Sequence, residues 1–310
     1  MKSKPLISIL VACYNGERFI DKCLESITEQ TYSILEILVV NDGSTDSSFE
    51  LLSKWSKIDN RIKIINQENK GISKTRNVLL DKSTGDYLYF VDVDDWIELD
   101  AINKFVKIVL LNNPDFIANS FYKSTTKKDC IFYISNNMND INSKKEYLIK
   151  NTPFAWGILI RKKFITDNDF RFNERSDFFE DAGVMTYWIY KAKIFCYLRE
   201  PQYHYFVNKS SISRGKKMNF NKITSAIEQL DNFYRLLDRE SFDVFPREIN
   251  DQLAFYHCII FTYINFQSEI SRKNKVKLKK HLQLLEIKKL KYPKIYWKFW
   301  YFVLYRLFMY

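Results

Sequence analysis

The fold is decided by the stretch Tyr87-Leu88-Tyr89-Phe90-Val91-Asp92-Val93-Asp94-Asp95, an apolar run that ends in three carboxylates. Its first five residues predict a buried strand. Toward the N-terminus, similar apolar runs predict strands over 62–65, 35–40 and 6–12, and helical spacing predicts helices over 73–83, 47–57 and 20–30. Apolar strands that alternate with helices predict an α/β fold with a mostly parallel sheet and helices on both faces.

Two of the three carboxylates have the spacing of a metal site. Asp92 and Asp94 lie two residues apart at the end of an extended segment, so both side chains should leave it on one side. Their charges repel unless a cation lies between them, and carboxylate oxygens suit Mn²⁺ or Mg²⁺. A solvated turn is the alternative. The third acid, Asp95, has capping-box spacing to Glu98 ahead of a helix expected near Leu99, so we expect a helix cap there.

Polar residues also follow the other expected strands, at the edge where ligands of such sheets bind. Asp42 ends the second strand and could accept a hydrogen bond from a nucleobase or a ribose, or form a turn with Gly43. Asn69-Lys70-Gly71 and Arg76 frame the start of a helix, which fits either a phosphate site or a solvated helix start. No G-x-G-x-x-G follows the first strand, which argues against a dinucleotide cradle.

Four motifs in this order are similar to those of a known family. They are Pro5-Leu6-Ile7-Ser8-Ile9-Leu10-Val11-Ala12-Cys13-Tyr14-Asn15, Val39-Val40-Asn41-Asp42-Gly43-Ser44-Thr45-Asp46, Asn69-Lys70-Gly71-Ile72-Ser73-Lys74-Thr75-Arg76-Asn77, and Gly85-Asp86 followed by the opening stretch. Residues 5–100 resemble the inverting GT-A glycosyltransferases of family two, of the bacterial cell-surface polysaccharide type. A weaker resemblance continues to about Gly215, through Phe178-Phe179-Glu180-Asp181 and Tyr203-His204-Tyr205. It implies a GT-A fold, which is Rossmann-like and binds nucleotides.

The resemblance also implies roles for residues at the expected donor site. Ala12, Tyr14 and Glu17 would line the nucleobase pocket, with Tyr14 against the ring. Asp42 would accept the N3–H of uracil, which suits a UDP-sugar. Arg76 would reach the base or the diphosphate.

Further roles concern the metal and the catalytic base. By resemblance, Asp94 would bind the metal and Asp92 would hold the ribose or assist the metal. Asp181 would be the general base, with Glu180 in reserve, and the two phenylalanines before them would raise the pKa of that base. A helix cap is the alternative for Asp181. His204 would be a further metal ligand or, alternatively, a packed strand histidine.

Length and charge suggest how the 310 residues are organised. We expect a catalytic domain over 1–215, divided into a nucleotide-binding half (1–100) and an acceptor half (101–215), and a helical C-terminal region over 216–310. Residues 271–310 hold twelve Lys or Arg and one acid, Glu286, which accounts for the whole net charge of +11. This basic, aromatic tail is too short in its apolar run to span a bilayer, and it predicts an interfacial helix on an anionic membrane. Packing on the catalytic domain is the alternative.

The expected function follows from these observations. An inverting glycosyltransferase would move a sugar from a UDP-sugar to a hydroxyl of a lipid-linked glycan, as in capsule synthesis, with Mn²⁺ or Mg²⁺ on the diphosphate. Five cysteines without a C-x-x-C pair, and no signal peptide, predict a cytoplasmic enzyme, peripheral on the inner face of the membrane.

Three alternatives fit the sequence less well. A sugar nucleotidyltransferase would carry a Gly-rich basic loop after the first strand. A phosphatase of the haloacid-dehalogenase type would carry its D-x-D on its first strand. A non-enzymatic protein that binds nucleic acid or another anionic surface through the tail would be expected to have a basic body, whereas residues 1–270 are neutral. We therefore expect no nucleic-acid partner.

Overall fold

A computed structural model describes residues 3–125, 129–132, 141–151, 154–176, 179–181, 183–207, 219–240, 246–266 and 270–284. The strands are β1 (Ile7–Cys13), β2 (Leu35–Asp42), β3 (Ile62–Gln67), β4 (Tyr87–Asp92), β5 (Trp96–Ile97), β6 (Phe116–Ser124), β7 (Asp129–Phe132), β8 (Leu159–Arg161) and β9 (Phe195–Phe206). The helices are α1 (Ile20–Thr28), α2 (Ser48–Ile58), α3 (Ile72–Lys82), α4 (Ala101–Asn112), α5 (Ile141–Asn151), α6 (Lys162–Asp167), α7 (Val184–Lys191), α8 (Phe220–Asp238), α9 (Arg247–Phe266) and α10 (Arg272–Leu284).

The strands form one sheet in the order β3-β2-β1-β4-β8-β6-β9-β5, with β7 beside β6. The first four strands in this order, β3, β2, β1 and β4, are all parallel, as the alternating pattern predicts. The second half is mixed, because β8 runs antiparallel to both of its neighbours while β6 and β9 are parallel. The expected mostly parallel sheet therefore describes residues 1–100 well and residues 101–215 less well.

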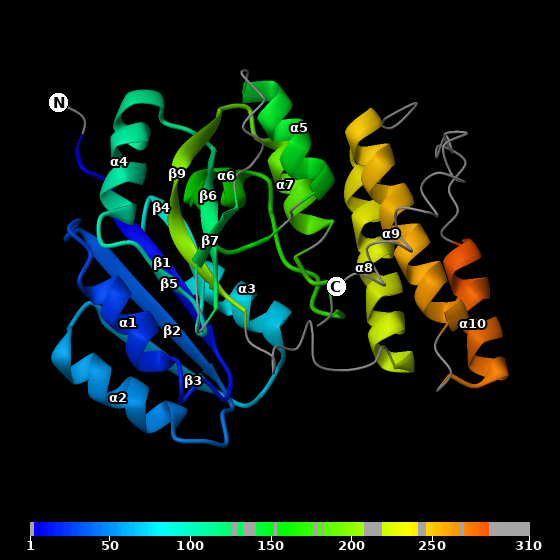
Figure 1. Ribbon diagram of the computed structural model, residues 1–310, viewed down its shortest axis with the longest axis horizontal. Helices are drawn as coiled ribbons and strands as arrows, with labels where there is room; N and C mark the ends of the chain where they lie inside the picture. Colours follow the sequence, from blue (N-terminus) through cyan, green and yellow to red (C-terminus); the bar gives the residue numbers. More distant parts are fainter. Residues whose placement is uncertain are drawn as a thin grey trace.

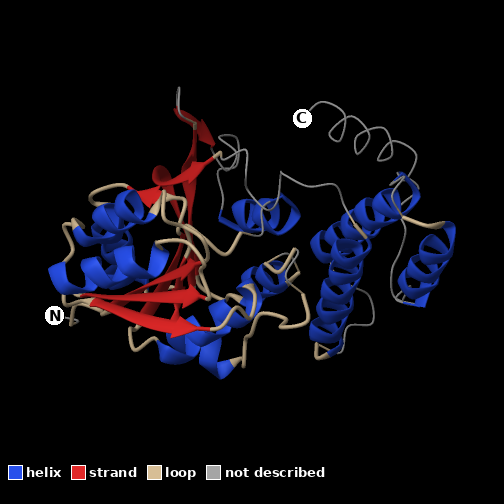
Figure 2. Cartoon of the chain, turned by 90° about the horizontal axis from the view of Figure 1, so that it is seen from below, coloured by secondary structure: helices blue, strands red, loops and turns tan. Residues whose placement is uncertain are grey.

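Strand alternation divides the apolar side chains between two cores, one on each face of the sheet. In β1, Ile7, Ile9 and Val11 face α1, α2 and α4, whereas Leu10 faces the other side. In β4, Tyr89 belongs to the same core as Ile9, and Phe90 belongs to the same core as Leu10. Helices cover both faces of the parallel part of the sheet (Figure 2), so β1 and β4 are buried on both sides and their sequences are mostly apolar.

The C-terminal helices extend the core that contains Leu10 of β1. Figure 1 shows α8, α9 and α10 side by side, with α8 next to α7 and α9 in contact with α5. Leu278 and Leu282 of α10 belong to the same buried cluster as Leu10 of β1. Within the described ranges, none of the helices combines the length and apolar character that a membrane crossing requires. The aromatic tail beyond residue 284 lies outside the described residues.

Candidate active site

The strand-end residues gather at one edge of the sheet, where β1, β2 and β4 end. Ala12 is the register partner of Asp92 on one side and of Val40 on the other. Asp42 is paired with Gln67 at the end of β3. An open cleft of about 670 Å³ lies over the ends of β2 and β3, lined by Asn41, Gly43, Ser44, Thr45, Asp46, Phe49, Glu50, Asn66, Gln67 and Glu68. Its size is that of a small-molecule site.

Asp42 organises the loop ahead of α3. Its carboxylate accepts hydrogen bonds from the amides of Lys70 (2.8 Å) and Gly71 (3.0 Å) and from the Gln67 side chain (2.7 Å). The amides that seemed suited to a phosphate therefore point at this carboxylate. Gly43 makes the close approach feasible, since its φ is +69° and a Cβ there would lie 2.5 Å from the Asn69 nitrogen.

The loops after β1 and β2 are tied together by side chains. Asn15, whose φ is 50°, accepts from the Thr45 amide at 2.8 Å, and its own amide donates to Ser44. Glu17 accepts from the Ser47 amide at 3.1 Å, which places its carboxylate at the start of α2. Tyr14, in contrast, is 48% exposed beside this junction and offers an uncovered ring. Asn15 was not among the predicted site residues, although its position after β1 marks a turn.

The acidic cluster is arranged differently from the expected alternating strand. β4 ends at Asp92, and Val93 and Asp94 form a turn closed by a hydrogen bond from the Asp95 amide to the Asp92 carbonyl (2.9 Å). Strand alternation is thus not what brings Asp94 to Asp92. The two carboxylates still interact, because burial and the charge of Asp92 raise the pKa of Asp94 to about 6.

The prediction that Asp95 caps a helix is wrong. Its side chain is 1% exposed and accepts hydrogen bonds from the Tyr203 hydroxyl (2.6 Å) and the Phe206 amide (2.7 Å). The next helix begins only at Ala101 and has no side-chain cap. Burial, followed by the charges of Asp94 and Asp92, raises the pKa of Asp95 well above its ordinary value. Asp95 therefore joins the strand-end turn to β9.

Arg76 links the acidic strand end to the second acidic motif. From α3 its guanidinium donates to Glu180 at 2.8 Å and to Asp92 at 3.3 Å, and its side chain is 4% exposed. Burial alone would disfavour its charge, but Glu180, Asp92 and Asp181 raise the pKa of Arg76. One buried cation thus brings residues 92 and 180, far apart in sequence, into a single site.

Asp181 and Glu180 have different environments within that site. Glu180 is held by Arg76, whereas no side chain of the described residues bonds to the Asp181 carboxylate in the same way. Burial, then the charge of Glu180, raises the pKa of Asp181 to about 8, although Arg76 opposes the shift. An acid with such a pKa can exchange a proton near neutral pH.

His204 is placed as a packed histidine. Its Nε2 lies 2.7 Å from Glu98 and its Nδ1 lies 3.0 Å from the Ser124 hydroxyl, so both ring nitrogens have protein partners. The ring is stacked between Trp96 and Tyr122, with centroids at 4.9 and 4.4 Å. This arrangement leaves neither nitrogen directed at a metal, and it contradicts the expectation of a third ligand.

The carboxylates at the end of β4 fit a divalent cation. Among the described residues no cluster of three or more His, Cys, Asp or Glu side chains could hold a metal by itself. Asp92 and Asp94 nevertheless offer hard oxygen donors, and their mutual repulsion favours a cation. Mg²⁺-type sites usually combine one or two carboxylates with water and substrate phosphates, so two protein ligands suffice.

The fold is similar to that of the GT-A glycosyltransferases. The structure of S. aureus TarS residues 1–349 in complex with UDP-GlcNAc has a TM-score of 0.71 at 19% identity, over 92% of this chain and 81% of that one. The mannosyltransferase PcManGT of Pyrobaculum calidifontis, with GDP-Man and Mn²⁺, has a TM-score of 0.56 at 17% identity, over 92% and 82%. The model of glycosyl transferase family 2 matches residues 8–175, and the chain belongs to that family.

Curated relatives agree with this membership. The putative glycosyltransferase EpsH of Bacillus subtilis is 34% identical over an alignment of 217 positions, which covers 67% of this chain and 62% of EpsH. Glycosyltransferase GlyA of Streptococcus pneumoniae serotype 4 is 33% identical over an alignment of 226 positions, which covers 67% of this chain and 31% of GlyA. The chain therefore spans less than two thirds of the length of these relatives.

Proposed function

We propose that this enzyme is an inverting glycosyltransferase that transfers a sugar from a UDP-sugar to a hydroxyl of a lipid-linked glycan in cell-surface polysaccharide synthesis. The observation that carries the proposal is the bridge made by the buried Arg76 guanidinium, which holds the acidic end of β4 and the pair Glu180–Asp181 in one half-buried site. Such a site can hold a diphosphate at one side and remove a proton at the other.

Each residue has a part in a single in-line displacement. The acceptor oxygen would bond to the anomeric carbon as the bond from that carbon to the diphosphate breaks, and the hydroxyl proton would pass to Asp181. Arg76 would hold the Glu180 side chain in place beside this base. Asp94, with Asp92, would hold the divalent cation, which when bound neutralises the charge of the leaving diphosphate. Ala12 and Tyr14 would contact the base, and Asp42 would accept its N3–H.

The donor is tested by hydrolysis of UDP-glucose, UDP-galactose, UDP-N-acetylglucosamine and UDP-N-acetylgalactosamine with Mn²⁺. We expect turnover of at least one, abolished by chelation. Turnover of a GDP- or dTDP-sugar, with none of the UDP-sugars, would overturn the assignment of Asp42 to uracil. Hydrolysis of none of these donors would remove the support for the proposed activity.

The base is tested with Asp181→Asn. This change keeps the shape of the side chain but removes its ability to accept a full proton, so transfer should stop while UDP still binds with unchanged affinity. Glu180→Gln is the matched variant, because Glu180 is paired with Arg76. Retained transfer in Asp181→Asn, together with loss in Glu180→Gln, would move the base to Glu180.

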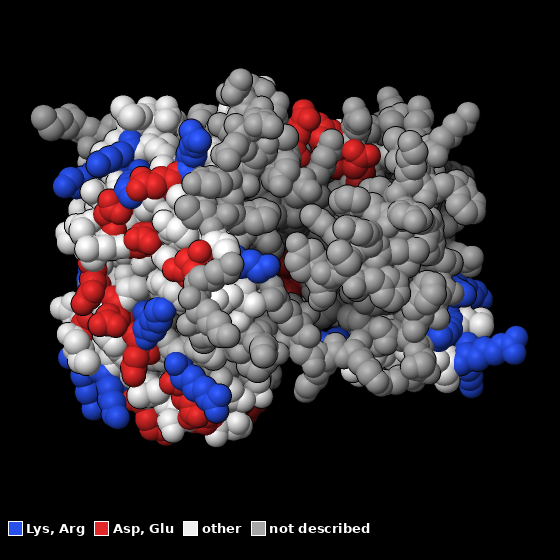
Figure 3. All heavy atoms as spheres, in the orientation of Figure 1, with Lys and Arg blue, Asp and Glu red and all other residues white. Residues whose placement is uncertain are grey.

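The proposal also includes attachment to an anionic membrane surface on the inner face of the cell membrane. Figure 3 shows Lys and Arg side chains at the end of the molecule where α10 lies. This helix exposes four basic side chains, namely Arg272, Lys273, Lys277 and Lys280, while Leu278 and Leu282 pack inward. Each such cation adds about 1 kcal/mol of attraction near an anionic leaflet.

Vesicle binding tests this part of the proposal with substitutions at exposed residues of α10. We expect Lys273→Glu/Lys277→Glu/Lys280→Glu to leave the fold intact and to weaken co-sedimentation with phosphatidylglycerol-containing vesicles. Deletion of 285–310 is the companion variant and separates α10 from the aromatic tail. Equal binding of all three proteins to anionic and neutral vesicles would argue against a membrane role.

A further inference from the structure

Three residues of α8 contact the segment that carries the acidic pair, in matching order. The Ser176 hydroxyl donates to the Ser225 carbonyl at 3.1 Å, and the Gln229 amide donates to the Glu180 carbonyl at 3.2 Å. Phe233 lies against Gly183, where a Cβ would come within 2.7 Å of the Phe233 side chain. The three α8 residues are four apart, so they lie along one face of the helix.

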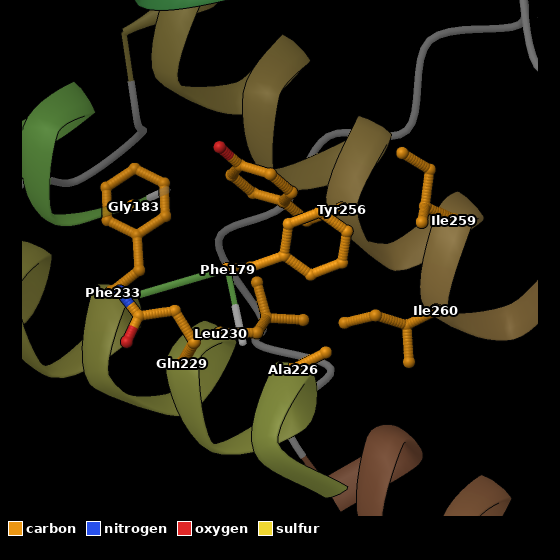
Figure 4. Close-up of a pocket in the computed structure, with 9 residues that line it drawn as sticks. All are labelled: Phe179, Gly183, Ala226, Gln229, Leu230, Phe233, Tyr256, Ile259 and Ile260. Carbon is orange, nitrogen blue, oxygen red and sulfur yellow. The ribbon is translucent and has the colours of Figure 1, made fainter. Parts of the chain in front are cut away.

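The segment that α8 contacts is strained beside the acidic pair. Phe179 has a φ of 58°, a left-handed conformation that a bulky residue rarely adopts. Strain of this kind amounts to about 1–3 kcal/mol and persists only where the surroundings impose it. The Phe179 ring enters a cavity between α8 and α9, lined by Leu230, Tyr256 and Ile260 among others (Figure 4). The C-terminal helices thus provide the surroundings that hold the strained residue.

Gln229 contributes a polar contact that packing alone does not need. It is 3% exposed, and among the described residues its Oε1 has no hydrogen-bond partner. Burial of the Gln229 side-chain amide therefore has a free-energy cost, and the amide nitrogen donates its hydrogen bond to the Glu180 carbonyl. That carbonyl belongs to the peptide group that joins Glu180 to Asp181. Gln229 therefore restrains the peptide group that leads into Asp181, and with it the direction of the Asp181 side chain.

We propose that α8 is part of the catalytic apparatus, with Gln229 as a positioning residue that sets the orientation of Asp181 toward the acceptor hydroxyl. This inference rests on the proposed function, because it needs Asp181 as the base. It assigns a catalytic task to a helix that lies beyond residues 8–175, the part matched by the family model. Misplacement of a base by about 1 Å lowers the rate on the order of 10²-fold.

The test compares Gln229→Met with Gln252→Met. Methionine keeps the length of glutamine, and Gln252 is an equally buried glutamine of α9 with an unpartnered Oε1. For the best UDP-sugar of the panel, we expect Gln229→Met to lower kcat on the order of tenfold to 10²-fold. The donor KM, the Kd for UDP and the urea midpoint should stay near those of the unsubstituted enzyme. Gln252→Met should retain kcat.

Several results would overturn the inference. Unchanged kcat in Gln229→Met, with Asp181→Asn inactive, would refute the positioning role and leave the base assignment in place. Equal losses of kcat in the two glutamine variants would attribute the effect to general weakening of the helical region. An active Asp181→Asn would instead refute the proposed base itself. If Gln229→Met does not fold, Gly183→Ala tests the neighbouring contact of α8, between Phe233 and Gly183, and wild-type kcat in that variant would refute the role of α8.

Discussion

Removal of one hydroxyl, in Tyr203→Phe, tests the link between the strand-end turn and β9. Tyr203 is fully buried, and its hydroxyl donates to Asp95 at 2.6 Å while accepting from the Asp92 amide at 3.1 Å. Phenylalanine fills the same volume apart from the oxygen. The change therefore leaves packing in place and removes two hydrogen bonds from the turn that carries Asp94.

The size of the effect depends on the charge of Asp95. A hydrogen bond to a neutral carboxyl group contributes about 1 kcal/mol, and one to a carboxylate contributes about 1.5–3 kcal/mol. Burial raises the pKa of Asp95, so the group gains charge only as the pH rises well above its ordinary pKa. Because the bond from the Asp92 amide is lost as well, we expect Tyr203→Phe to reduce the free energy of unfolding by about 2 kcal/mol at low pH and by up to about 4 kcal/mol at high pH.

Urea denaturation at pH 5.5 and pH 9 measures this difference, and Tyr89→Phe is the control. Tyr89 is also fully buried, but its hydroxyl has no hydrogen-bond partner among the described residues. Its removal should be neutral or slightly stabilising at both pH values, because an unpaired buried polar group is lost. Equal destabilisation by the two variants, or a Tyr203→Phe effect that shrinks as the pH rises, would refute the reasoning.

Three further predictions concern the site and the sheet. Asp94→Asn should lower Mn²⁺-dependent donor hydrolysis on the order of 10²-fold while UDP without metal still binds, and a Mn²⁺ titration that matches the unsubstituted enzyme would contradict the metal role. Because Asp181 must be ionised to act as a base and its pKa is raised to about 8, kcat/KM should rise with pH between about 7 and 9; a flat profile would exclude this group. Glu36→Gln should destabilise the protein by about 1–3 kcal/mol at pH 7, because bonds from Ser8, Thr84 and Lys63 outweigh burial and lower the pKa of Glu36. The stability that Glu36 contributes is present at pH values above its pKa in the unfolded chain and is lost as the pH falls through its pKa in the folded protein. The urea curves of the two proteins should therefore converge in acid, and a constant difference between them would count against the assignment.

The parallel half of the sheet was predictable because its signal is local. In β1 and β4, consecutive apolar residues enter two cores, which requires strands without polar interruptions. Once such strands are parallel, their carboxyl ends must meet at one edge, so Asp42 and Asp92 could be placed together from the sequence. The mixed half of the sheet lacks that signal. β8 has three residues and β5 has two, and neither is long enough to show a period.

Asp95 shows why a local pattern can fail. Its spacing to Glu98 is that of a capping box, but the observed partners, Tyr203 and Phe206, lie more than a hundred residues away. These long-range contacts accompany the pairing of β5 with β9. The residues that directly follow Asp95 are therefore in a strand and not in the first turn of a helix. The same strand pairing explains the environment of His204. It places the ring between Trp96 and Tyr122, where it packs as a strand side chain and not as a metal ligand.

The Arg76 bridge marks the limit of motif-based reasoning in the other direction. Each motif specifies an acid or a base at a strand or helix end, but a motif does not state which charges will share one buried position. Arg76 was expected to meet a nucleotide; in the fold it meets Asp92 and Glu180. Because burial of that guanidinium requires both carboxylates, the two acidic motifs depend on each other through it. Loss of either acid would leave a buried charge partly unpaired, so substitution at Asp92 should also disturb the orientation of the Glu180–Asp181 peptide, which Gln229 restrains from the opposite side.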